Sequence, residues 1–344
     1  MSTLFLAHTE PDGTLAKSAL EALAATIQLA ESLGAPFSIG LIGELTSPAA
    51  EAIATCGAAK VLTLTGPEFS HARYATDAAG AESLCRAAGA TLVTVAATSR
   101  WNRVLPGVAH RLGGCADTHV TGLSVSNGQP HVSRWFYRQR MEAAFTRTTR
   151  PWLLALEGGI ATAESLALRQ TSSAAPVEIH SLTPSAPRTQ VTGFESPASD
   201  QQTIRPDADL LFVTGAGWTK KQADGLVKVT EAETIIRDFL RLSRSSLGST
   251  KSLVDLGGEG QSVLPFLSHL NQVGQTGSTP RHAKGLSTCC HGEEPHTVGW
   301  RFIGQRRAIS LDANCGWARG KADILYVADA FAVMTAVNAR LTNP

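Results

Sequence analysis

The chain has 344 residues, of which 43% are apolar and 17% charged, so it is long enough for two domains and is not a disordered chain. Lys plus Arg number 30 and Asp plus Glu 29, and this formal net charge of +1 gives no electrostatic case for binding nucleic acid or an acidic membrane surface. No apolar run approaches the roughly 20 residues that span a bilayer, and the first ten residues lack the basic segment of a signal peptide. We therefore expect a cytoplasmic protein that is not membrane-embedded.

The first half of the chain alternates short apolar runs with segments of helical periodicity. The runs are expected to be strands, at residues 3–8, 37–42, 60–65, 91–96 and 152–156. The periodic segments are expected to be helices, at residues 15–33, 75–88 and 104–112. Asn127-Gly128 separates two further apolar stretches and predicts a β-hairpin. This order predicts a parallel-rich sheet covered by helices on both faces.

The composition changes after about residue 182, where Pro, Ser, Thr, Gln and Asp replace the apolar runs. A second α/β segment begins with an apolar run at 210–214, followed by helical periodicity at 229–242, a strand-like run at 308–311 and a final helix at 328–341. We expect an α/β protein of two domains, residues 1–185 and 207–344, joined by a linker at 186–206. The second domain is predicted to be Rossmann-like.

A glycine-rich turn follows the first strand of the second domain, Gly215-Ala216-Gly217-Trp218-Thr219-Lys220-Lys221. Such a turn can seat a phosphate, because glycines let backbone N–H groups approach and a helix N-terminus adds partial positive charge. The third glycine of G-x-G-x-x-G is Lys220, so a plain strand-to-helix turn remains an equal alternative.

The loop Asn271-Gln272-Val273-Gly274-Gln275-Thr276-Gly277 is more specific. Two glycines bracket a Gln and a Thr, so the loop can present N–H groups and a hydroxyl to a flat, heteroatom-rich ligand. Carboxylates near strand ends are candidate ribose ligands, and the alternative is that they are helix caps or surface charges. They are Asp312, Asp323 and Asp329.

Six cysteines are scattered along the chain, and none forms a C-x-x-C pair. Cys289-Cys290-His291 is a poor metal motif, because adjacent cysteines do not readily share one tetrahedral ion. We expect free thiols and no metal.

The order and spacing of the second half resemble the FAD domain of electron transfer flavoprotein alpha subunits. The family's Val-Gly-Gln-Thr-Gly is intact at residues 273–277, and Cys290-His291-Gly292…His296 is similar to its Ser-Gly-Ala-Ile-Gln-His. Thr250-Lys251…Val254-Asp255 resembles Ser-Arg…Val-Asp, and residues 322–329 resemble Ala-Asp-Tyr-Gly-Leu-Val-Ala-Asp. In the first half, residues 101–106 are similar to the family's Gly-Lys-Asn-Val-Leu-Pro run.

The resemblance implies that the second domain binds FAD. Gln275 and Thr276 would lie beside the flavin N5 and O4 edge, and His296 would donate to the O2 edge. Lys251 would stand where the family has an arginine against the ring. Asp312 would lie near the adenosine end, and Asp329 or Asp323 would hold the ribose. The remaining implied contacts come from the glycine-rich turns and the phosphate region: Gly215, Gly217, Gly274, Gly277, His291 and Gly292.

Two departures from the family's pattern bear on this expectation. Ala216 replaces the arginine that would face the pyrophosphate, and Lys251 keeps the charge of the family's arginine but lacks its planar fork. By resemblance the protein would be an electron carrier in a heterodimer with a smaller beta-type subunit, taking electrons from a flavoprotein dehydrogenase and passing them to a membrane quinone reductase or another acceptor. The alternative is a relative that lost FAD and serves as a structural or regulatory binding subunit. A pyridine-nucleotide oxidoreductase would need a full G-x-G-x-x-G, which this chain lacks.

Overall fold

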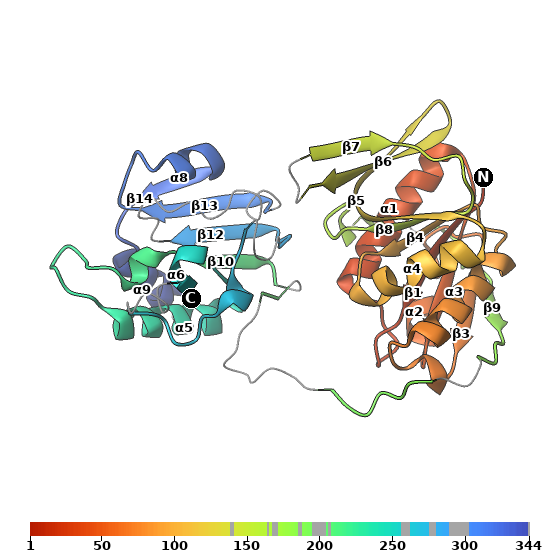
Figure 1. Ribbon diagram of the computed structural model, residues 1–344, viewed down its shortest axis with the longest axis horizontal. Helices are drawn as coiled ribbons and strands as arrows, with labels where there is room; N and C mark the ends of the chain where they lie inside the picture. Colours follow the sequence, from red (N-terminus) through yellow and green to blue (C-terminus); the bar gives the residue numbers. More distant parts are fainter. Residues whose placement is uncertain are drawn as a thin grey trace. The chain divides into compact units, whose positions relative to one another are not determined.

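The computed structural model divides the chain into two compact units, unit 1 at Met1–Gly193 and unit 2 at Phe194–Pro344 (Figure 1). Each unit is a separate α/β fold, which confirms the predicted fold class. The structure describes residues 1–137, 141–163, 165–166, 171–184, 188–194, 204–205, 208–255, 262–274, 280–288 and 303–342.

In unit 1, the described residues form one nine-stranded sheet in the order β7-β6-β5-β8-β4-β1-β2-β3-β9. In this order, all neighbouring strands from β5 to β9 are parallel. β6 and β7 extend the sheet beyond β5 as antiparallel strands. The strands are β1 Thr3–His8, β2 Phe37–Gly43, β3 Val61–Thr65, β4 Leu92–Ala96, β5 Cys115–Ser126, β6 Gln129–Phe136, β7 Met141–Phe145, β8 Trp152–Leu156 and β9 Val177–His180.

Helices cover both faces of this sheet, as its buried strands require. α1 (Lys17–Leu33) and α2 (Ser47–Ala52) pack on the face that carries Phe5 and Ile39. α3 (Tyr74–Ala87) and α4 (Ser99–Arg111) pack on the opposite face, against the alternate residues of the same strands. Gly34 ends α1 in the left-handed conformation at φ 59°, which glycine adopts without strain.

The predicted hairpin is confirmed. Asn127 and Gly128 both have positive φ, at 52° and 69°, as a two-residue hairpin turn requires, and they join β5 to β6. Strands β7 and β9 were not predicted, and β8 lies between β5 and β4. α4 begins five residues before the predicted start, because the Thr98 hydroxyl caps it by accepting from the Trp101 N–H.

In unit 2, the described residues form a five-stranded parallel sheet in the order β11-β10-β12-β13-β14. The strands are β10 Leu210–Thr214, β11 Ser246–Ser249, β12 Lys284–Thr288, β13 Gln305–Ser310 and β14 Ile324–Val327. The short helical segments are the 3₁₀ turns η3 Ala216–Thr219 and η5 His269–Asn271, with α6 Lys251–Asp255 and α8 Gly316–Lys321.

The longer helices α5 (Val229–Ser243) and α9 (Ala330–Thr342) lie together on one face of this sheet, and α8 lies on the other (Figure 1). Phe212 and Ile309 point to the α5/α9 face, where Phe239 and Phe331 pack, whereas Val213 and Ala308 pack against Ala318 of α8. This two-sided burial is what an all-parallel sheet needs.

Candidate functional site

The site expected from the sequence lies at the carboxyl edge of the unit 2 sheet. The chain leaves β10 to form β11 on one side and returns to form β12 on the other. In open parallel sheets, ligands bind where strand order reverses in this way, in the crevice outside the carboxyl ends of the strands. The described loops at this edge follow β10, β11, β13 and β14.

The glycine-rich turn after β10 is tightly built into the protein. The Gly215 N–H donates to the Thr288 carbonyl oxygen at 3.0 Å, and the Gly217 carbonyl accepts from the Gln222 side chain at 3.0 Å. The buried Trp218 donates its Nε1–H to the Thr288 hydroxyl at 2.8 Å. A single 3₁₀ turn follows, and α5 begins only at Val229, so no α-helix N-terminus adjoins this turn. Gly215 and Trp218 therefore link this turn to β12, and Gly217 is bonded to Gln222 within the turn region.

Lys251 is the first residue of α6, directly after β11, and its side chain is 47% exposed. The Lys251 ammonium pairs with the Asp255 carboxylate one helical turn further on. The preceding Thr250 is buried; its N–H donates to the Thr214 carbonyl at 2.9 Å and its hydroxyl accepts from the Leu253 N–H at 3.4 Å. Lys251 thus projects a positive charge from a fixed backbone at the carboxyl edge.

Gly274 lies beside the end of β11. The Val273 N–H donates to the Ser249 carbonyl at 3.0 Å, and Gln272 and Ser249 form an isolated parallel β-bridge. Gly274 itself has φ 139°, a backbone conformation that other residues rarely adopt. The Val-Gly-Gln-Thr-Gly loop therefore starts beside Ser249, two residues before Lys251, although Val273 and Lys251 are 22 residues apart in the sequence.

Ser249 supplies an observation that the sequence did not suggest. Its hydroxyl is fully buried at the last position of β11 and has no hydrogen-bond partner among the described residues. A buried polar atom without a partner costs free energy, and such atoms are often satisfied by a bound ligand or water.

Asp312 and Asp329 follow β13 and β14 at the same edge of the sheet. Asp312 accepts the Asn314 N–H at 2.8 Å and closes a turn. Asp329 accepts the Ala332 N–H at 2.8 Å and so caps α9. Each carboxylate keeps lone pairs for a further donor.

Asp323 lies elsewhere. It precedes β14, at the amino edge of the sheet, where it accepts from both the N–H and the guanidinium of Arg306, at 2.7 and 2.9 Å. The Arg306 side chain, followed by its backbone N–H, lowers the pKa of Asp323. The structure therefore does not bring Asp323 together with the other predicted residues.

The remaining predicted residues lie outside the described part of the chain: Gln275, Thr276, Gly277, His291, Gly292 and His296, with Cys289 and Cys290. The four described cysteines, Cys56, Cys85, Cys115 and Cys315, are free. Within the described ranges, no group of three or more His, Cys, Asp or Glu side chains could hold a metal ion. Those ranges also contain no helix with the length and apolar character of a membrane span.

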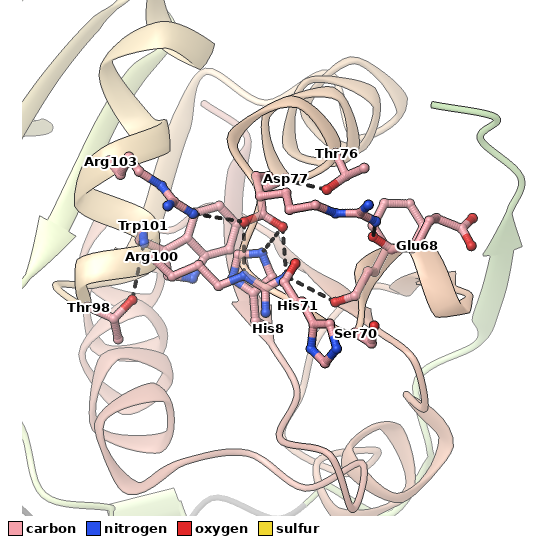
Figure 2. Close-up of polar contacts among 12 residues, drawn as sticks. His8, Glu68, Ser70, His71, Thr76, Asp77, Thr98, Arg100, Trp101 and Arg103 are labelled. Atoms are coloured by element: carbon pink, nitrogen blue, oxygen red, sulfur yellow. Dashed lines mark hydrogen bonds and ion pairs between the residues drawn. The ribbon is translucent and has the colours of Figure 1, made fainter. Parts of the chain in front are cut away.

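Unit 1 contains a buried polar cluster at the carboxyl ends of β1 and β4 (Figure 2). Asp77 of α3 is fully buried and binds the Arg100 guanidinium through both oxygens, at 2.7 and 2.9 Å. Arg100 also donates to the Phe69 and His71 carbonyls, at 3.0 and 3.3 Å. The pair therefore fastens residues 69–71 to α3 and α4.

His8, at the end of β1, completes this cluster. Its Nε2 is 3.4 Å from the Asp77 carboxylate, and its ring lies 4.2 Å from the ring of Trp101. Burial lowers the pKa of His8, against the opposing effect of Asp77. Burial alone would raise the pKa of Asp77, but hydrogen bonds from His8 and Arg100 outweigh it and lower that pKa. We did not predict this cluster; its one signal in the sequence is an aspartate on the apolar face of a helix.

A second buried carboxylate organises the antiparallel end of the unit 1 sheet. Asp117 on β5 accepts from Arg147 (Nη2 at 2.9 Å), from Arg134 at 3.2 Å and from the Trp152 Nε1–H at 2.8 Å. Burial alone would raise the pKa of Asp117, but the hydrogen bonds from Arg147 and Trp152 outweigh this effect. The pKa of Asp117 is therefore below its ordinary value. Asp117 therefore joins β5 to Arg134 on β6, to Arg147 after β7 and to Trp152 on β8.

The fold defines a protein of two α/β units, the second of which is built on an open parallel sheet. The family model of the electron transfer flavoprotein domain matches residues 3–185, more than half of the 344 residues, so the chain belongs to the electron transfer flavoprotein family. A comparison with curated proteins found no match.

Proposed function

We propose that this chain is the alpha-type subunit of an electron transfer flavoprotein and that it binds one FAD at the carboxyl edge of the unit 2 sheet. The family membership supports an electron-transfer role. The observation that carries the FAD assignment is the pairing of Val273 with Ser249, because it starts the Val-Gly-Gln-Thr-Gly loop at the place where an open parallel sheet binds its ligand.

The described residues fit such a group. The buried Ser249 hydroxyl has no described partner, and Gly274 has a conformation that lets a backbone approach a ligand closely. In the proposal, Lys251 turns from Asp255 toward the flavin or phosphates, and Asp329, which lies at the carboxyl edge, holds the ribose. We assign Asp323 no contact, since Arg306 holds it at the amino edge.

When bound, FAD supplies the one- or two-electron chemistry that no side chain provides. In the proposal Gln275, Thr276 and His296 hold the flavin edge, and a donor near its O2 atom favours the reduced, negatively charged ring. The chain would form a heterodimer with a beta-type subunit, receive electrons from a flavoprotein dehydrogenase and deliver them to a quinone reductase. Exposed apolar residues at both edges of the unit 1 sheet support a partner there, Met141 on β7 and Ile179 on β9.

Lys251→Ala tests the site directly. Titration of the full-length chain with FAD, followed by flavin fluorescence, should show binding that is weakened by about tenfold in this variant, because a charge-assisted contact is lost. Arg241→Ala is the control, since Arg241 makes an exposed ion pair with Asp238 in the last turn of α5, which leads to the amino end of β11 and not to the carboxyl edge. Equal affinities for both variants would remove Lys251 from the site.

A second function is favoured by one observation. The Gly215 N–H is occupied by Thr288, and Ala216, where the family has arginine, is fully buried, so this turn presents no guanidinium to a pyrophosphate. A relative that keeps the fold as a structural or regulatory subunit without FAD would have these features. Failure of the wild-type chain to bind FAD in the same titration would select this alternative.

A further inference from the structure

Unit 2 contains a cavity of about 580 Å³ between the sheet and α9. It is lined by the first residues of β10 and β12 and by residues along β13 and β14. Its volume is within the range of about 300–1,000 Å³ that is typical of small-molecule sites.

The walls of the cavity are aliphatic and come from the sheet and from one helix. Strand pairing places Leu210 beside Lys284, and Leu286 beside Arg307, all on the α9 face. α9 reaches only part of this face, so Ile324 and Tyr326 on β14 remain 43% and 42% exposed. The aliphatic lining consists of Leu210, Leu286, Ile309, Val333, Met334 and Val337.

Two cations stand in this apolar setting. Lys284 and Arg307 are diagonal neighbours on adjacent parallel strands, both line the cavity, and both are exposed. Neither forms an ion pair within the described part of the chain. Gln305 and Tyr326, which also line the cavity, add polar groups that can donate hydrogen bonds. Two like charges without a counter-ion at the mouth of an apolar cavity favour an anion over a neutral or cationic ligand.

We propose that this cavity binds a small amphipathic carboxylate, with its hydrocarbon body against α9 and the sheet and its carboxylate between Lys284 and Arg307. The arrangement matches the general design of small-molecule sites, an apolar cavity with a few convergent polar groups. The site is separate from the proposed FAD site, because the residues that line the cavity include none of those assigned to FAD.

Calorimetric titration of the full-length chain with straight-chain carboxylates from butanoate to dodecanoate tests the proposal. Affinity should rise about fourfold for each added methylene until the cavity is filled. Octylammonium should bind at least tenfold more weakly than octanoate. Equal binding of the two ions, or no saturable binding of any chain length, would overturn the proposal.

Variants distinguish the contribution of the ligand's carboxylate from that of its hydrocarbon body. Lys284→Gln combined with Arg307→Gln should weaken octanoate binding about tenfold. The control Lys321→Gln, in α8 on the other face of the sheet, should leave it unchanged. Val333→Trp should fill the cavity and abolish binding while FAD binding and the unfolding transition are retained. Octanoate binding that survives in Val333→Trp would place the ligand elsewhere and contradict the proposal.

Discussion

At the scale of single residues, the buried carboxylates of unit 1 are bound by arginine side chains. Asp77 is fully buried, and its two oxygens are satisfied by Arg100 and approached by His8. A buried ion pair adds little net stability, but removing one partner leaves a charge without compensation in the interior.

Asp77→Asn should therefore destabilise the protein by about 3 kcal/mol, measured by urea unfolding. The side chain stays nearly isosteric, so the loss reports the uncompensated Arg100 guanidinium. Glu82→Gln is the control, because its pairs with Arg86 and Arg111 are at the surface and worth about 0–1 kcal/mol. A loss in Asp77→Asn no larger than in Glu82→Gln would refute this account of the cluster.

His8 makes the stability of unit 1 depend on pH. Burial lowers its folded-state pKa below the ordinary value of 6.5, so the unfolded chain binds the proton more readily. Stability should fall as the pH drops below about 6.5, by up to about 1.4 kcal/mol per pH unit. The lowered pKa of Asp77 adds a further loss below about 3.8.

Urea unfolding between pH 7.5 and 5 measures this effect. His8→Gln should flatten the profile in that window, and His110→Gln, which changes an exposed histidine at the end of α4, should not. A profile for His8→Gln as steep as that of the wild type would show that other groups cause the loss.

At the scale of elements, β11 and the segment beside it fix the start of the loop that we assign to FAD. A Cβ on Gly248 would lie 2.6 Å from the Val273 side chain, so the close approach of the two segments depends on this glycine. Gly248→Ala should cost about 1–3 kcal/mol of stability and weaken FAD binding, because Val273 and Gly274 must move. The double variant Gly248→Ala/Val273→Ala should recover part of both losses, and an unchanged FAD affinity in Gly248→Ala would separate this segment from the cofactor site.

Asp329 has a structural role beside the proposed ribose contact. Asp329→Ala should lower stability by about 1 kcal/mol through loss of the α9 cap, measured by thermal or urea unfolding. Asp329→Asn should preserve stability, since asparagine caps helices about as well as aspartate. Equal destabilisation by both substitutions would show that the charge, and not the cap, stabilises α9.

Much of the fold follows from local patterns. Buried parallel strands such as β1, β2 and β8 are continuous apolar runs, and Asn127-Gly128 identifies the hairpin. β12 was not predicted, because Lys284–Thr288 contains a single large apolar residue and is recognised as a strand only through pairing with β10 and β13. Sequence spacing also could not show that Asp323 and Asp329 lie at opposite edges of the sheet, because one precedes and the other follows the four-residue strand β14.

The polar clusters could not be predicted for a different reason. Asp77 and Arg100 belong to two helices, and Asp117 and Arg147 to segments 30 residues apart, so each pair forms only when the tertiary structure is complete. Lys251 and Gly274 were grouped by resemblance, and it is the pairing of Val273 with Ser249 that brings their segments together.

At the scale of the whole molecule, our account assigns different binding roles to the two α/β units. Unit 1 binds a partner subunit, and unit 2 binds the cofactor. The family match lies on unit 1, whereas the proposed cofactor residues lie on unit 2. The account therefore depends on whether unit 2 binds a flavin.

The most direct test is the visible absorption spectrum of the full-length chain, purified with a co-expressed beta-type subunit and reduced stepwise with dithionite. The account predicts the two flavin absorption bands, a stoichiometry of about one FAD per heterodimer, and loss of the bands on reduction. A protein that is colourless and stays colourless after incubation with excess FAD would contradict it.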